Sequence, residues 1–123
     1  APTEEIKENI IQELINYFSK KINVLHQKGI HDIILDPGFG FGKSLAQNYE
    51  IVDNFEELKI LDKPILVGVS RKSMIYKKLN ASPENSLTGT IALNSVLFHK
   101  GASIFRVHDV AEMNCIRTLL SQN

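Results

Sequence analysis

Three stretches of the sequence place charged side chains and glycines directly after short apolar runs. They are ILDPGFGFGKS at residues 34–44, PILVGVSRKSMI at residues 64–75 and IFRVHDV at residues 104–110. The first stretch is not a Walker loop, G-x-x-x-x-G-K-[ST], because Pro37 stands at the first glycine and offers no N–H to a phosphate. It is not the dinucleotide motif G-x-G-x-x-G either, because Lys43 stands at the last glycine. A different kind of ligand must be considered.

The acid Asp36 ends the apolar run of the first stretch. Its two acceptor oxygens suit a planar pair of donors, such as the edge of an amino-pyrimidinone ring. The alternative is a helix cap, but Pro37 and Gly38 delay the next helix and leave Asp36 free for a ligand. Phe39 and Phe41 are bulky apolar residues in the same loop, and one of them could stack on a flat ring. Packing under the loop remains open for Phe39 and is less favoured for Phe41.

The other two stretches end in cations. Arg106 and His108 alternate with apolar residues along a predicted strand, so they share one face and suit an anion such as phosphate or pyrophosphate. The alternative, equally supported, is a salt bridge from Arg106 to a neighbouring acid, with His108 as a capping or packing residue. Lys72 could bind a carbonyl or ring acceptor, and Ser70 with Arg71 could hold a carboxylate. A basic turn of this kind is, taken alone, more often solvated.

Apolar periodicity and glycine or proline residues predict the elements that position these side chains. The first helix runs from Glu4 to Lys28, with Thr3 as its N-cap and Gly29 as its stop. The segments that follow are a strand at 33–35 buried on both faces, a helix containing Ile51, Val52, Phe55 and Leu58, a strand at 64–70, a helix at about 71–79, a helix from Ser82 and Pro83 to Lys100, a strand at 103–110 and a last helix. Gly101 ends the longer of these helices, and Asp109 with Glu112 predicts an acidic capping box for the last one.

The order α-β-α-β-α-β-α predicts a parallel α/β sheet, whose ligands bind at the carboxyl ends of the strands. With 123 residues, of which 43% are hydrophobic, the chain has the material for one domain. Fourteen basic and fourteen acidic residues leave no net charge, so neither nucleic acid nor a membrane is an expected partner. The sequence has no signal peptide pattern, and we expect a cytoplasmic protein. It begins at Ala1, which suggests a fragment.

The three quoted stretches, in this order and spacing, closely resemble signatures of the dihydropteroate synthase family. The resemblance covers nearly the whole chain and implies the last three strands of a (β/α)₈ (TIM) barrel, so residues 1–123 would form a partial pterin-binding domain. The family joins 6-hydroxymethyl-7,8-dihydropterin pyrophosphate to p-aminobenzoate, giving 7,8-dihydropteroate and pyrophosphate in folate biosynthesis, with Mg²⁺ assisting the leaving group. The resemblance therefore implies a transferase with these two small-molecule substrates.

The resemblance also implies roles for individual residues. It makes substrate-binding residues of Asp36, Gly40, Phe41, Gly68, Ser70, Arg71, Lys72, Arg106 and His108, with Lys72, Arg106 and His108 as the catalytic ones. Asp36 would accept hydrogen bonds from the pterin, and Lys72 would contact the pterin carbonyl or a ring nitrogen. Phe41, Ser70 and Arg71 would line the p-aminobenzoate pocket, where sulfonamides compete. Arg106 and His108 would bind pyrophosphate, with Arg106 also against the pterin ring.

The chain departs from the family in size, because a TIM barrel takes about 250 residues. Five strands are absent, and with them the family's metal-binding asparagine, so no metal ligand is expected in this chain. We expect the chain alone to be inactive.

Family members form dimers through their last helices, which here are the segment Ser86–Lys100 and the final helix. The alternatives are a related pterin-binding methyltransferase acting on methyltetrahydrofolate, which the SRKS stretch disfavours, and a non-catalytic half-barrel that assembles with a partner.

Overall fold

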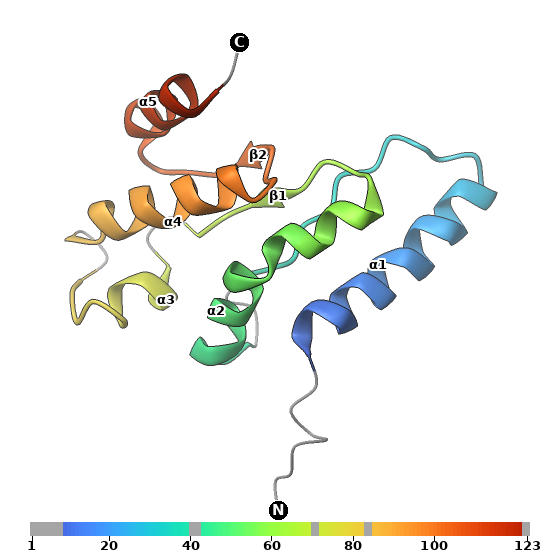
Figure 1. Ribbon diagram of the computed structural model, residues 1–123, viewed down its shortest axis with the longest axis horizontal. Coiled ribbons are helices and arrows are strands. Elements are labelled where there is room, and N and C mark those ends of the chain that lie inside the picture. Colours follow the sequence, from blue (N-terminus) through green and yellow to red (C-terminus); the bar gives the residue numbers. More distant parts are fainter. Residues whose placement is uncertain (1–8, 40–42, 70–71, 83–84, 122–123) are drawn as a thin grey trace, which may run out of the picture.

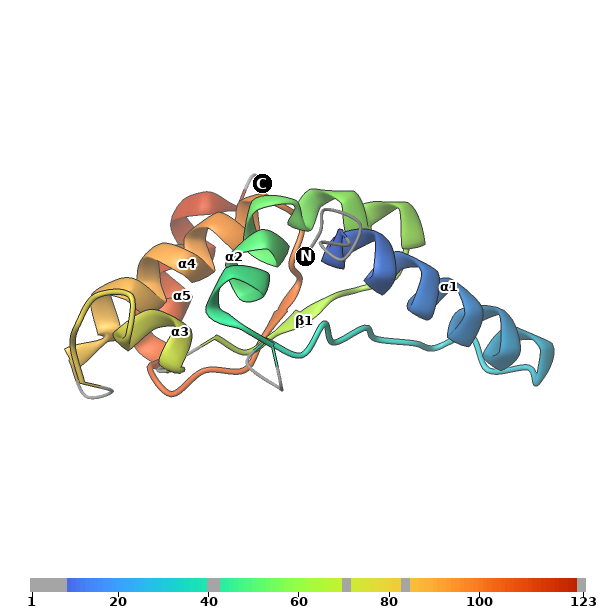
Figure 2. The same cartoon turned by 90° about the horizontal axis from the view of Figure 1, so that it is seen from below.

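The computed structural model describes residues 9–39, 43–69, 72–82 and 85–121 of the chain. Its elements are α1 (Ile10–Gln27), α2 (Leu45–Asp53), the 3₁₀ helix η2 (Phe55–Leu61), β1 (Leu66–Val67), α3 (Ser73–Tyr76), α4 (Leu87–His99), β2 (Ile104–Phe105) and α5 (Val110–Leu120). Figure 1 places α1 and α5 at opposite ends of the molecule, with β1 and β2 between them. In Figure 2 the extended segments line one side, and α1, α2 and α4 lie along the other.

Three extended segments lie side by side and run parallel. Leu35 forms a parallel bridge with Ile65, while β1 pairs with β2 through Leu66 opposite Ile104 and Val67 opposite Phe105. The backbone N–H of Leu66 donates to the Leu35 carbonyl at 2.8 Å. Parallel pairing of segments that are separated by helices is the arrangement expected of an α/β protein, so the predicted fold class is confirmed.

The strands are shorter than the sequence predicted. Residues 33–35 do not form a strand, and Ile34, predicted to be buried, is 57% exposed. In the described part of the chain, this segment pairs with a neighbour along one edge only, through the bridge to Ile65. Among the same described residues, the other edge has no backbone hydrogen bonds to a second strand that would lengthen it. Of the described residues in the predicted strands at 64–70 and 103–110, only β1 and β2 are strands, and Ile65 before β1 is paired through its bridge to Leu35.

The first helix begins later than predicted. The side chain of Asn9 accepts hydrogen bonds from the N–H groups of Ile11 and Gln12 and so caps α1, whereas Thr3 and Glu4 lie outside the described residues. The predicted stop at Gly29 is confirmed, because its φ of 81° suits glycine and its N–H donates to the His26 carbonyl. None of the helices within the described ranges is both long and apolar enough to cross a lipid bilayer.

The predicted helix around Ile51 and Leu58 is divided in two at Asn54, with α2 before it and η2 after it. A capping box that was not predicted begins α2: the Ser44 hydroxyl accepts from the Gln47 N–H at 3.1 Å, and the Gln47 side chain accepts from the Ser44 N–H at 2.9 Å. This box satisfies backbone donors at the start of α2 and fixes where the loop after Gly38 must end.

Two other predicted boundaries and one predicted cap were wrong. The helix after β1 ends at Tyr76 instead of near residue 79, and α4 begins at Leu87 instead of at Ser82, because an Asn85 N–H to Ser82 carbonyl turn intervenes. Asp109 is the N-cap residue of α5 but makes no capping hydrogen bond through its side chain. Its ψ is 74°, against 165° for the capping residue of α2. The stop at Gly101 is confirmed by its φ of 118°.

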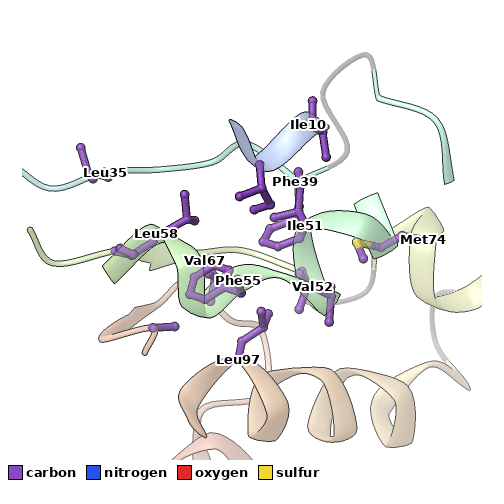
Figure 3. Close-up of a cluster of buried hydrophobic side chains, with 14 of the residues drawn as sticks. Ile10, Leu35, Phe39, Ile51, Val52, Phe55, Leu58, Val67, Met74 and Leu97 are labelled. Atoms are coloured by element: carbon purple, nitrogen blue, oxygen red, sulfur yellow. The ribbon is translucent and has the colours of Figure 1, made fainter. Parts of the chain in front are cut away.

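The apolar core lies between the extended segments and the helices that cover one side of them. Phe39, Phe55, Val67 and Leu97 come from four separate segments and are each at most 1% exposed. Figure 3 shows these side chains in one cluster. Full burial of a large apolar side chain contributes roughly 1.5–3 kcal/mol. The cluster therefore holds the helices against the sheet and fixes the strand ends relative to one another.

We predict that Ser44→Ala destabilises the chain by about 1 kcal/mol, because it removes the hydroxyl that accepts the Gln47 N–H. The measurement is urea unfolding followed by circular dichroism. Ser121→Ala is the matched control, since Ser121 is an exposed serine after the end of α5. Equal destabilisation by the two substitutions would show that the capping box contributes nothing.

Candidate functional site

Polar side chains from the ends of three neighbouring extended segments meet at one edge of the sheet. Asp36 follows the Leu35 bridge, Lys72 lies beyond β1, and Arg106 directly follows β2. Arg106 Nη1 lies 3.5 Å from Asp36 Oδ2. Both of these charged groups are close enough to Lys72 to affect its pKa. The strand-end rule therefore predicted correctly that these three residues would come together.

Asp36 is not the cap of the following helix, as predicted, because Ser44 has that role. The prediction that its carboxylate is free was wrong. One oxygen accepts the Gly38 N–H at 2.9 Å, and the other pairs with Arg106. The two paired side chains are 41% and 54% exposed, so the ion pair contributes roughly 0–1 kcal/mol. A ligand with better-aligned donors can therefore displace it.

Arg106 lies on the opposite face of its segment from Phe105. The Phe105 ring stacks on Phe98 of α4 with centroids 6.1 Å apart, while the Arg106 guanidinium lies against Gly68 and Asp36. In the chain without ligand, Arg106 therefore pairs with a neighbouring acid, Asp36, which was one of the two alternatives for this residue. β2 ends at Phe105, although the Arg106 N–H still donates to the Val67 carbonyl at 2.9 Å. His108 is exposed and lies outside β2, so its position on the same face as Arg106 stays a prediction.

Lys72 connects the first two stretches. Its Nζ donates to the Phe39 carbonyl at 3.1 Å. Partial burial lowers the pKa of Lys72, the Arg106 cation lowers it further, and the Asp36 carboxylate opposes these effects. Phe39 itself is buried in the core at 1% exposure, so of the two interpretations left open for it, packing under the loop is confirmed.

The sequence analysis missed the role of Lys43, whose Nζ donates to the Gly38 carbonyl at 2.9 Å and ties the two ends of the loop together. The sequence feature that could have indicated this role is the position of Lys43 directly after a glycine-rich loop, in the stretch that does not match the Walker motif. Four predicted substrate-binding residues lie outside the described residues: Gly40, Phe41, Ser70 and Arg71. Their roles remain predictions.

Magnesium would need oxygen ligands held at short distances. Within the described ranges, no three His, Cys, Asp or Glu side chains are grouped so that they could hold a metal ion. Asp36, the acid at the ends of these segments, is already paired with Arg106. These residues do not fit a magnesium site by themselves.

We predict opposite shifts of the Lys72 pKa when its two charged neighbours are neutralised. Asp36→Asn removes the anion that raises this pKa and lowers it further, whereas Arg106→Gln removes a cation and raises it. The measurement is an NMR titration of the Lys72 side chain in the ligand-free protein. Shifts in the same direction in both variants would contradict the geometry of this cluster.

Comparison with known proteins adds evidence that is independent of this geometry. A family model described as "Pterin binding enzyme" matches residues 1–108. Dihydropteroate synthase of Escherichia coli K12 is 42% identical over 107 residues, which are 85% of this chain and 38% of that protein. The enzyme of Clostridium beijerinckii is 45% identical over 107 residues, with 85% and 40% covered. The chain thus spans about two fifths of the length of these curated relatives.

Solved structures agree. The structure of Yersinia pestis DHPS with a pterine-sulfa conjugate matches with a TM-score of 0.87 and 37% identity, covering 91% of this chain and 45% of that one. Dihydropteroate synthase from Xanthomonas albilineans in complex with 7,8-dihydropteroate matches with a TM-score of 0.86 and 32% identity, covering 91% and 45%. The parallel strands and helices of this chain correspond to part of a TIM barrel, as predicted. The chain belongs to the pterin-binding enzyme family.

Proposed function

We propose that this chain carries the pterin-binding part of a dihydropteroate synthase, which condenses 6-hydroxymethyl-7,8-dihydropterin pyrophosphate with p-aminobenzoate. The observation that carries the proposal is the meeting of Asp36, Lys72 and Arg106 at the ends of three neighbouring segments. It is supported by relatives named dihydropteroate synthase and by a matched structure that holds 7,8-dihydropteroate. These matches do not favour a methyltransferase or a non-catalytic half-barrel.

In this proposal Asp36 recognises the edge of the pterin. The 2-amino group and the ring N–H form a planar donor pair that fits the two carboxylate oxygens, with stronger bonds than those to a neutral acceptor. Lys72 donates to the pterin carbonyl or a ring nitrogen. Its Nζ already donates to a backbone carbonyl at 3.1 Å, so a carbonyl of the ligand offers the same chemistry.

Arg106 and His108 are proposed to bind the pyrophosphate that leaves. The amine nitrogen of p-aminobenzoate forms a bond to the pterin methylene carbon as the bond from that carbon to the pyrophosphate oxygen breaks. The bonding pair departs with pyrophosphate, and the new amine loses a proton to solvent. Negative charge grows on the leaving group during this step, so a cation at its position stabilises the transition state more than the ground state.

The remaining residues complete the proposed pocket. Phe41, Ser70 and Arg71 are proposed to line the p-aminobenzoate side, with Ser70 and Arg71 holding its carboxylate. Gly40 is proposed to allow the backbone to approach the ligands closely, and Gly68 to contribute to the pocket from beneath the Arg106 guanidinium. Magnesium belongs to the proposal through the resemblance alone, and no step above is assigned to it. The proposal also includes the cytoplasmic location expected from the sequence.

The proposal extends to a homodimer formed through α4 and α5. Between these helices lies an apolar groove of about 340 Å³, lined by Ile91, Ser95, Glu112, Cys115, Ile116, Leu119 and Leu120. The side chain of Leu119 is 81% exposed beside it. A second copy that covered this groove would remove the exposed apolar surface from water.

We predict that the chain binds dihydropterin pyrophosphate and that Asp36→Asn weakens this binding at least about tenfold, since a hydrogen bond to a charged group contributes roughly 1.5–3 kcal/mol. The measurement is isothermal titration calorimetry. Asp32→Asn is the matched control, because Asp32 is an exposed acid at the other end of the same extended segment. Unchanged affinity in Asp36→Asn, or no binding by the unmodified chain, would count against the proposal.

Turnover is tested separately in a chimaera. The segment of the E. coli enzyme that matches this chain over 107 residues is replaced by this chain's sequence, and dihydropteroate formation is measured. Activity that Asp36→Asn reduces and Asp32→Asn leaves unchanged supports the proposed roles. An inactive chimaera that is folded and binds the pterin would contradict the roles of Lys72, Arg106 and His108 in the chemical step.

For the dimer, we predict that Leu119→Glu converts the protein to a monomer, because it places a charge on the apolar surface that the second copy covers. The measurement is size-exclusion chromatography with light scattering. Ile60→Glu is the matched control, since Ile60 is 76% exposed on η2, away from the groove. A monomer before any substitution would refute the dimer.

A further inference from the structure

Gly68 lies directly beneath the guanidinium of Arg106. A Cβ atom added at Gly68 would lie 2.6 Å from Nη2, 2.9 Å from Cζ and 3.0 Å from Nε of Arg106. Three guanidinium atoms at similar distances mean that this flat group faces the backbone where a side chain would otherwise be. The residue is buried, immediately after β1, and the cation that covers it comes from the end of β2.

The backbone at this position does not itself require glycine. Gly29, Gly38 and Gly101 have positive φ angles of 81°, 74° and 118°, whereas Gly68 is not among the residues with positive φ. An alanine can therefore adopt the backbone conformation of residue 68 without strain. What excludes a side chain there is the far end of Arg106, which is flexible and can move away.

We propose that Gly68 is a positioning residue, whose missing side chain lets the guanidinium of Arg106 lie at the strand ends beside Asp36 and Lys72. This inference deepens the proposed function and rests on it for the consequence for pterin binding. The placement of the guanidinium in the chain without ligand stands on the geometry alone.

The expected displacement is large enough to matter. To reach an ordinary contact of 3.4 Å from a new Cβ, instead of 2.6 Å, Nη2 of Arg106 must retreat by about 0.8 Å. The pair between Arg106 Nη1 and Asp36 Oδ2 already measures 3.5 Å, so a shift of this size changes it substantially. The pKa of Lys72 changes when Arg106 moves, because the Arg106 cation is one of the causes of its lowered value.

The experiment is a double-mutant cycle with Gly68→Ala, Arg106→Gln and both together. In the ligand-free protein, NMR follows the Arg106 Nε–H signal and the Lys72 pKa. Gly68→Ala is expected to move both in the parent background, with little change in melting temperature. In the Arg106→Gln background it is expected to leave the Lys72 pKa unchanged. A pKa change of the same size in both backgrounds, or no change in either, overturns the proposal.

Affinity for 6-hydroxymethyl-7,8-dihydropterin pyrophosphate is then measured for the same four proteins. Gly68→Ala is expected to lower this affinity about tenfold, which is the effect of losing one well-placed charged contact. In the Arg106→Gln background, Gly68→Ala is expected to cause no further loss of affinity. If the parent chain binds no pterin, but the effect of Gly68→Ala on the Lys72 pKa depends on Arg106, the proposed function fails and the positioning role stands. If the pterin binds and Gly68→Ala does not weaken it, the consequence for binding is overturned.

Folding provides the last check. If Gly68→Ala unfolds the chain and the double variant with Arg106→Gln folds, the contact between residue 68 and Arg106 is the cause, as proposed. If both variants unfold, residue 68 needs glycine for another reason, and the proposal is wrong.

Discussion

The parallel pairing of three short extended segments is the constraint on which the rest of this structure depends. The bridge between Leu35 and Ile65, and the pairing of Leu66 with Ile104, put three points far apart in the sequence side by side. Because parallel strands all end at the same edge, one carboxylate and two cations meet there. Few backbone hydrogen bonds thus determine where the charged groups lie.

The core and the site are connected through the loop that follows Asp36. The ring of Phe39 is packed in the core, while its carbonyl accepts the hydrogen bond of Lys72. At the other end of the loop, Lys43 bonds back to the Gly38 carbonyl and Ser44 begins α2 with its capping box. Burial of the Phe39 ring therefore helps to fix the position of the Lys72 amine, so packing in the core contributes to the geometry of the charged groups at the strand ends.

Sequence reasoning succeeded where a residue's own chemistry decides the structure. Gly29 and Gly101 adopt the positive φ angles that their positions as helix stops predict. It failed where the outcome depends on neighbours: Ile34 is exposed because the helices cover only the opposite face of its segment, where Leu35 is buried, and Asp109 lacks the backbone angle that lets a side chain cap. The gathering of Asp36, Lys72 and Arg106 followed from the strand-end rule. The contact of Arg106 with Gly68 joins two strands and has no signature in either local sequence.

The ion pair between Asp36 and Arg106 has a chemical meaning for the proposed ligand. A guanidinium and the edge of an amino-pyrimidinone both present two N–H groups on a planar N–C–N unit. In the chain without ligand, Asp36 thus already holds an internal imitation of the group that it is proposed to recognise. In the proposed complex, the donor pair of the pterin replaces the Arg106 contact at one carboxylate oxygen and the Gly38 N–H at the other. The arginine released in that complex is available for the anion carried by the same molecule.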